Sequence, residues 1–135
     1  MDTIFTVSDP LGRPISLKSD TYNKKIANID GSNDHNEHGN SHPEVKIEEI
    51  RNGVERPQFI AQGHIIVRDG EEEKKVITDK RQEFYRFSLD DRSSILKTIV
   101  AFDDNNIGDI VTSFICNKAS SIKLEGGVIY DSTER

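Results

Sequence analysis

Three of the four histidines in this 135-residue chain lie in one short polar stretch, and they are the side chains best suited to chemistry. His35, His38 and His42 follow the spacing His-x2-His-x3-His, with Asp34 and Glu37 beside them. An imidazole titrates near neutral pH, so a histidine can serve as a general acid or a general base. Two histidines and a carboxylate can instead hold a zinc ion. The stretch therefore raises two candidate chemistries, acid–base catalysis and metal binding.

Among these histidines, His42 has the setting that best suits catalysis. Ser41 and Glu44 fit a capping box, which predicts that a helix begins at this point. A helix N-terminus attracts an anionic phosphate, and its dipole favours the neutral imidazole that a general base requires. A metal site is less favoured, because Gly39, Asn40 and the cap would interrupt any helix holding the three histidines on one face. We therefore predict no metal site and no cofactor. The ordinary alternative for His42, a solvated histidine in a first helical turn, stays open.

The residues around this stretch predict short strands and two helices. Apolar alternation between turn signals indicates strands, and apolar residues at helical spacing indicate helices. The expected strands cover residues 3–7, 15–18, 63–68, 75–78, 82–89, 95–102, 107–116 and 128–130, and the expected helices cover residues 21–29 and the segment from Ser41 to Pro57. The charge run at residues 71–75 and the polar segment 30–40 are predicted to be loops. This order predicts one α+β domain over residues 1–135, with an N-terminal hairpin and two helices packed on a four- to five-stranded antiparallel sheet.

Composition narrows the classes of function. The formal net charge of −6 counts against broad, non-specific binding of nucleic acid, although a small basic pocket is compatible with it. No apolar run approaches the roughly 20 residues that a membrane-spanning helix needs. The single cysteine, Cys116, fits a reducing compartment, and the first residues lack the basic region of a signal peptide. We therefore predict a cytoplasmic protein with no membrane segment.

Six short motifs occur in an order that resembles a known nuclease family. They are Asp9-Pro-Leu-Gly-Arg-Pro-Ile, His42-Pro-Glu, Arg56-Pro57, Tyr85-Arg86, Leu96-Lys-Thr-Ile-Val and Val111-Thr-Ser-Phe. Together they resemble the phage barnase–EndoU–colicin–RelE-like (BECR) nucleases, over residues 3 to about 130. The resemblance implies a compact α+β fold and metal-independent cleavage of RNA, by attack of its 2′-OH group, in a toxin or phage-derived effector.

The chain departs from the family pattern at its first histidine. Lys25 stands where that histidine is expected, close after the matching aromatic residue Tyr22. Residues 30–41 look like a loop insertion relative to the family, and this insertion could bring His35 or His38 into the missing role. The departure puts the two-histidine acid–base arrangement of the family in question.

The resemblance and the residue types together define a candidate site. His42, Arg86 and Thr112 are the predicted catalytic residues, and Lys25 and Tyr85 are the predicted substrate-binding residues. Arg86 would grip a phosphate with its guanidinium group, and alternation places it on the strand face opposite its aromatic neighbours. The Thr112 hydroxyl would donate to a phosphate oxygen, Lys25 would add positive charge, and Tyr85 would stack on a base. The ordinary alternatives, a solvated arginine or lysine, a β-forming threonine and a core tyrosine, stay open.

Two functions follow from these residues. The first is an endoribonuclease that acts on RNA such as tRNA and is held in check by a cognate antitoxin or immunity protein. The second is a catalytically inactive relative that binds a partner protein, as an immunity or regulatory protein does. The missing first histidine and the negative charge favour the second function, whereas the motif order favours the first. Either protein could be a monomer or a homodimer.

Overall fold

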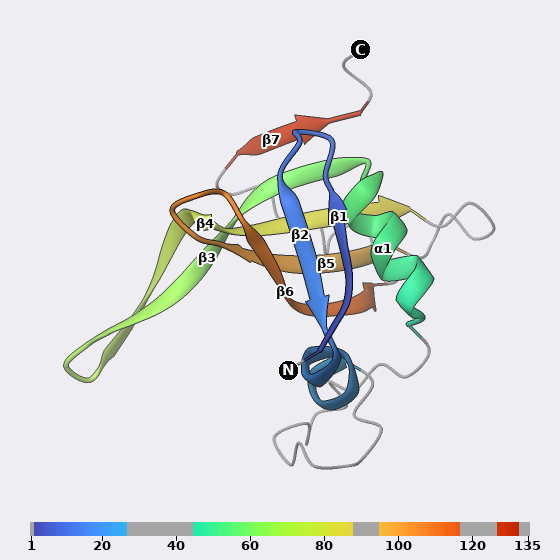
Figure 1. The fold of residues 1–135 in the computed structure, drawn as a ribbon. Coiled ribbons are helices and arrows are strands. Elements are labelled where there is room, and N and C mark those ends of the chain that lie inside the picture. Colours follow the sequence, from blue (N-terminus) through green and yellow to red (C-terminus); the bar gives the residue numbers. More distant parts are fainter. Residues whose placement is uncertain (1, 27–44, 88–94, 117–126, 133–135) are drawn as a thin grey trace.

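One curled sheet contains all seven strands of the described chain. The computed structural model describes residues 2–26, 45–87, 95–116 and 127–132. The strands are β1 (Thr3–Ser8), β2 (Pro14–Lys18), β3 (Phe59–Asp69), β4 (Glu72–Phe87), β5 (Ile95–Phe102), β6 (Gly108–Cys116) and β7 (Val128–Asp131), and the helices are the π-type η1 (Thr21–Ile26) and α1 (Ile47–Glu55) (Figure 1). The strand order is β1-β2-β6-β5-β4-β3-β7. Neighbouring strands are antiparallel except β2 and β6, which run parallel.

The predicted α+β class is wrong. In place of two helices on a four- to five-stranded antiparallel sheet, the described residues form a mainly β structure, a mixed seven-stranded sheet with one short α-helix. Two features account for the difference. The N-terminal hairpin joins the sheet through the parallel pairing of Ile15 with Gly108, and residues 72–75 of the charge run form strand rather than loop. Within the described ranges, no helix is long and apolar enough to cross a membrane.

The main core lies between α1 and the sheet face that this helix covers. Val45, which precedes the helix, and Ile50 and Val54 within it are fully buried against this face. Across from them, the ring of Phe84 stacks on that of Phe102 with centroids 6.4 Å apart. We call this side of the sheet the helix face, and the opposite side the open face.

The α-helix begins later than its predicted cap at Ser41. Lys46 is extended, with φ −85° and ψ 152°, and it is the N-cap of a helix whose first residue is Ile47. The Glu49 carboxylate accepts a hydrogen bond from the Lys46 amide at 3.2 Å, which is the back-bond of a capping box. The N-cap of α1 therefore lies five residues after the predicted one. Residues 41–44 and the predicted insertion at 30–41 lie outside the described residues.

Aspartate side chains stabilise the turns of two hairpins. Between β1 and β2, the Asp9 carboxylate accepts hydrogen bonds from the amides of Leu11 and Arg13 at 3.0 and 2.8 Å. The Arg13 Nε donates to the same carboxylate at 2.8 Å. Between β5 and β6, the Asp103 carboxylate accepts from the amides of Asn105 and Ile107. In both turns a side-chain oxygen satisfies amides that the strands leave unpaired.

The longest hairpin projects from the body of the sheet (Figure 1). Its outer part, residues 63–78 of β3 and β4, is called the arm. A short turn at Gly70 connects the two strands at the tip of the arm. Residues 71–75 are exposed, as predicted, but the predicted loop is wrong for residues 72–75, which pair with β3, and Glu71 alone lies in the turn. Five aliphatic side chains of the arm are 39–57% exposed, namely Ile65, Ile66, Val67, Val76 and Ile77.

A bulge at the root of the arm sets its direction. Gln62 pairs with Gln82, but the next residue, Gly63, pairs with Thr78, so β4 carries the extra residues 79–81. A Cβ atom at Gly63 would lie 2.8 Å from the Arg81 carbonyl oxygen, so the close approach of the two strands requires glycine. In the bulge, Lys80 Nζ lies 2.7 Å from Asp104 of the β5–β6 turn, and this hydrogen bond raises the pKa of Lys80.

Candidate functional site

The structure leaves the predicted role of His42 untested. His42, together with His35 and His38, lies outside the described residues. Its expected position at the mouth of a helix is not supported, because α1 begins at Ile47 and its N-cap is Lys46. Proximity of His42 to Arg86 or Thr112 therefore stays a prediction.

Arg86 lies on the helix face of the sheet, as its alternation with Tyr85 and Phe87 predicts. Its guanidinium donates a hydrogen bond to the carbonyl oxygen of Arg56, the residue that ends α1. A cation at a helix C-terminus satisfies an unpaired carbonyl and complements the helix dipole. The structure thus gives Arg86 a helix-capping contact, and its contact with a phosphate stays a prediction.

Tyr85 and Thr112 lie on the open face, away from Arg86. Tyr85 is 0% exposed, and its hydroxyl donates to Glu83 at 2.7 Å, so it offers no surface on which a base could stack. Thr112 is half-buried and pairs with Ile99 on β5. Because Arg86 and Thr112 occupy opposite faces, the sheet separates two of the three predicted catalytic residues.

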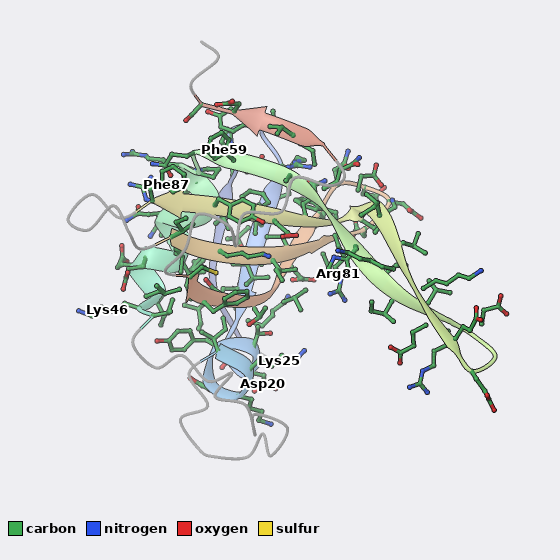
Figure 2. All side chains as sticks on the ribbon, turned by 180° about the vertical axis from the view of Figure 1, so that it is seen from behind. Asp20, Lys25, Lys46, Phe59, Arg81 and Phe87 are labelled. Carbon is green, nitrogen blue, oxygen red and sulfur yellow. The ribbon has the colours of Figure 1, made fainter. Side chains whose placement is uncertain are left out.

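Lys25 is exposed on η1, the short helix that packs against β2 and β6. Figure 2 shows it at the η1 end of the molecule, whereas Arg81 lies at the root of the arm. Tyr22 and Ile26 of the same helix pack against the main core, as their spacing predicts. In the described chain Lys25 is therefore a surface cation on the same helix as two core residues.

A compact polar cluster, formed by Glu83, Tyr85 and Lys97, lies on the open face. The Glu83 carboxylate, with its side chain 5% exposed, lies 2.7 Å from Lys97 Nζ, and it also accepts the Tyr85 hydroxyl. The Lys97 ammonium lies 5.6 Å from the Tyr85 ring centroid and 5.8 Å from that of Phe114. A buried carboxylate is stable when a cation and a hydrogen-bond donor compensate its charge, and both are present here.

A recess opens beside this cluster, where the arm leaves the sheet. Its volume is about 330 Å³, and it is lined by Gly63, His64, Ile65, Ile66, Arg81, Glu83 and Ile99. The arm forms one wall and the open face of β4 and β5 forms the other. This volume is at the small end of the range for pockets that hold small molecules, about 300–1,000 Å³.

Arg81 is the one group in the recess whose charge is not compensated by the described residues. Its side chain makes no hydrogen bond and no ion pair with any residue in the described ranges, although Arg81 is half-buried. Figure 2 shows it at the junction of the arm and the sheet. Glu83, in contrast, is already paired with Lys97. The recess therefore presents one guanidinium group between aliphatic walls, an arrangement that suits an anionic group.

Arg81, Glu83 and Lys97 were not predicted as site residues, although the sequence carries a signal for them. Arg81, Glu83 and Tyr85 alternate along one strand, which places their side chains on one face. Lys97 interrupts an otherwise apolar strand, residues 95–102, and a lone charge in such a strand commonly has a buried partner. The spacing alone gives no indication that the two strands bring these groups together.

The described residues contain no cluster of three or more His, Cys, Asp or Glu side chains that could hold a metal ion. The histidine stretch lies outside those ranges, so the zinc alternative is not addressed by the structure. Comparisons with protein-family models, with curated proteins and with solved structures find no match to this chain.

Proposed function

We propose that this protein is a binding module that holds a partner protein by adding a strand of that partner to its arm. The single observation that carries the proposal is the exposure of the arm. Ile66 is 57% exposed, and four further aliphatic side chains of the same ribbon are at least 39% exposed. An apolar ribbon that projects into solvent is expected to be covered in the working state of the protein, because it gains free energy when its surface is buried.

The outer edge of β3 is the part of the arm best suited to strand addition. Within the described residues, β7 pairs with β3 only at Phe59, Ile60 and Ala61, and Gly127 accepts a hydrogen bond from the Gln62 amide. Beyond this point no described strand covers β3. Backbone groups on an open sheet edge readily pair with an added strand, and pockets between alternate side chains provide selectivity.

The other edge of the arm, on β4, carries features that discourage pairing. It contains the lysines Lys74 and Lys75, and it ends in the bulge at residues 79–81. Lysines and bulges are the usual means by which a protein protects a sheet edge. The β3 edge between Gly63 and Asp69 has neither lysine nor proline. The partner is therefore expected on β3.

Substitution of Ile66 by lysine should weaken partner binding at least tenfold, because it places a charge in the edge that pairs and removes a central apolar contact. Ile77→Lys is the matched control, since Ile77 is a similarly exposed isoleucine of the arm but lies on β4. The measurement is the affinity of the purified partner, first found by capture on the wild-type protein. A partner that binds Ile66→Lys as tightly as wild type would refute strand addition at this edge.

A second candidate function is the metal-independent endoribonuclease activity implied by the motif order. One observation favours it. Arg81, Glu83 and Lys97 gather on the open face, and Thr112 is paired with Ile99, which lines the same recess. A carboxylate base with nearby cations is a combination that phosphodiester cleavage can use. His42 would then supply the second proton-transfer group. The single cysteine is consistent with action in the cytoplasm.

An assay of RNA cleavage in EDTA distinguishes the two functions. Purified protein is incubated with tRNA and with mixed RNA, beside the variants His42→Ala and Arg81→Gln. If the second candidate is correct, the wild-type protein leaves 2′,3′-cyclic phosphate ends and both variants lose at least a hundredfold in rate. If no RNA is cleaved at micromolar protein, the ribonuclease proposal fails and the binding module remains.

A further inference from the structure

We infer that the strand added to the arm is the same strand of a second copy of this chain, paired about a two-fold axis at Ile66. This inference rests on the proposed function and names its partner. In the resulting dimer, the β3 edges of two arms pair antiparallel along residues 63–69, and the acidic tip of each arm reaches the recess of the other copy.

The direction of the backbone groups along the β3 edge supports this pairing. The Gln62 amide donates outward, to the Gly127 carbonyl oxygen at 3.2 Å. Because backbone groups alternate in direction along a strand, the amide and carbonyl groups of His64, Ile66 and Arg68 also point outward. These groups have no neighbouring strand within the described residues. They form a row of donors and acceptors that a second strand can satisfy.

The length of the open edge fixes the register. It begins at Gly63, just beyond the contact of Gln62 with Gly127, and it ends at Asp69, where the turn of the arm starts. The centre of this stretch is Ile66. Full overlap of two such edges about a two-fold axis places Ile66 opposite the partner's Ile66, and Ile65 opposite the partner's Val67. Every aliphatic residue of the β3 edge then faces another aliphatic residue.

Charge complementarity favours a second copy as the occupant. The same register places the partner's Asp69 opposite Gly63, on the sheet face to which Gly63 and the recess belong. Asp69 lies at a tip rich in carboxylates, its side chain is 79% exposed, and its nearest cation is Lys74 at 4.0 Å. Arg81 lines the recess beside Gly63 and has no partner among the described residues. Each acidic tip would thus supply the anion that the other recess lacks.

The pairing closes as a dimer rather than continuing into a fibre. Each copy uses its β3 edge once, and the two-fold axis satisfies both edges at the same time. The remaining outer edges of the four-stranded ribbon belong to β4, where Lys74, Lys75 and the bulge at residues 79–81 oppose further addition. The net charge of the arm is also close to zero, since Arg68, Lys74 and Lys75 nearly balance its four carboxylates. Two arms can therefore approach without strong repulsion.

Sedimentation velocity on the full chain tests the dimer. We expect a concentration-dependent dimer for the wild type and for Ile77→Lys, and a monomer for Ile66→Lys. Arg81→Gln should form about a tenfold weaker dimer, because it loses two symmetry-related charged contacts at the surface. A wild-type protein that stays monomeric at about 100 μM, where even small and weak interfaces form, overturns the inference. So does a dimer that Ile66→Lys leaves intact.

A disulfide test fixes the register independently. In a Cys116→Ala background, Ile66→Cys should oxidise to a covalent dimer, because two residues opposite each other across the axis have Cα atoms about 5.5 Å apart. Lys75→Cys lies directly across the ribbon from Ile66 but on the far strand, so it should stay monomeric. Equal cross-linking of the two variants contradicts the pairing. If capture experiments find another protein on the β3 edge while the chain is monomeric, the dimer is refuted and the proposed function is retained.

Discussion

Replacement of Lys97 by methionine is expected to lower the free energy of unfolding by about 3–5 kcal/mol. The Glu83 and Lys97 side chains are only 5% and 13% exposed, and their charged groups lie 2.7 Å apart. Methionine preserves most of the apolar stem beside the Tyr85 ring but removes the ammonium group. The Glu83 carboxylate would then be buried with the Tyr85 hydroxyl as its remaining partner. An uncompensated buried charge is among the most destabilising changes that one substitution can make.

Urea denaturation of Lys97→Met, of Glu83→Gln and of the double variant measures this effect. The double variant should recover more than half of the loss, because a neutral amide needs no cation while it can still accept the Tyr85 hydroxyl. A loss below about 1 kcal/mol for Lys97→Met would show that solvent reaches the pair and that the polar cluster is not a closed site.

Substitution of Asp9 by alanine is the second large effect, with an expected loss of about 3 kcal/mol. Asp9 is 5% exposed, and its carboxylate accepts from two backbone amides and from Arg13 Nε. Its removal leaves the Arg13 guanidinium, whose side chain is 13% exposed, facing the Phe102 ring at 4.2 Å without its anion. The β1–β2 turn would lose its amide acceptor and gain an unpaired, partly buried cation at the same time.

Asp103→Ala provides the matched control for this substitution. The Asp103 carboxylate accepts from the amides of Asn105 and Ile107 in the same way, but it is exposed and holds no buried cation. Its loss should cost about 0.5–1 kcal/mol, as for an ordinary turn hydrogen bond. Thermal unfolding followed by circular dichroism compares the two variants. Equal losses would mean that the Arg13 contact contributes nothing.

Hairpins with local signals could be predicted from the sequence. The strand expected at residues 95–102 coincides with β5, and the turn at residues 103–106 joins it to β6 as expected. In this pair the apolar pattern, the turn chemistry and the length all indicate the same structure. A helix over the segment that contains Ile50 and Val54 could also be predicted, but its start could not, because the cap signal at Ser41 lies before the residues that become helical.

The arm could be predicted only in part: strands were expected at residues 63–68 and 75–78, which lie in β3 and β4, but residues 72–74 were expected to be loop. Both faces of this ribbon are exposed to solvent, so its sequence needs no alternation of apolar and polar residues. A run of charged residues without such alternation is typical of a loop. The mixed sheet was missed for a different reason. The parallel pairing of β2 with β6 joins segments far apart in the chain, and no local pattern reports such a partner. In both cases the structure depends on which segments of the chain pair with each other, and the local preferences of the residues do not reveal this.

The site was missed because it depends on these same contacts. The alternation of the strand predicts the face on which Arg86 lies, but its helix-capping contact depends on the position of Arg56 at the end of α1. Tyr85 was predicted to bind substrate, whereas the structure buries it within the polar cluster, where its hydroxyl donates to Glu83. A charged residue on a strand is usually expected to face solvent, so the sequence does not predict the buried ion pair of Glu83 with Lys97.

The parallel pairing of β2 with β6 also bears on the order in which this protein can assemble. Ile15 of β2 lies beside Gly108 of β6, so the first hairpin has no neighbouring strand until most of the chain has been made. At synthesis rates of about 5–20 residues per second, the wait is on the order of 5–20 s. During that time β2 has an open edge on the nascent chain. Closure of the sheet by a contact this distant in sequence is a slow step, and folding should therefore be completed late, after β6 has emerged.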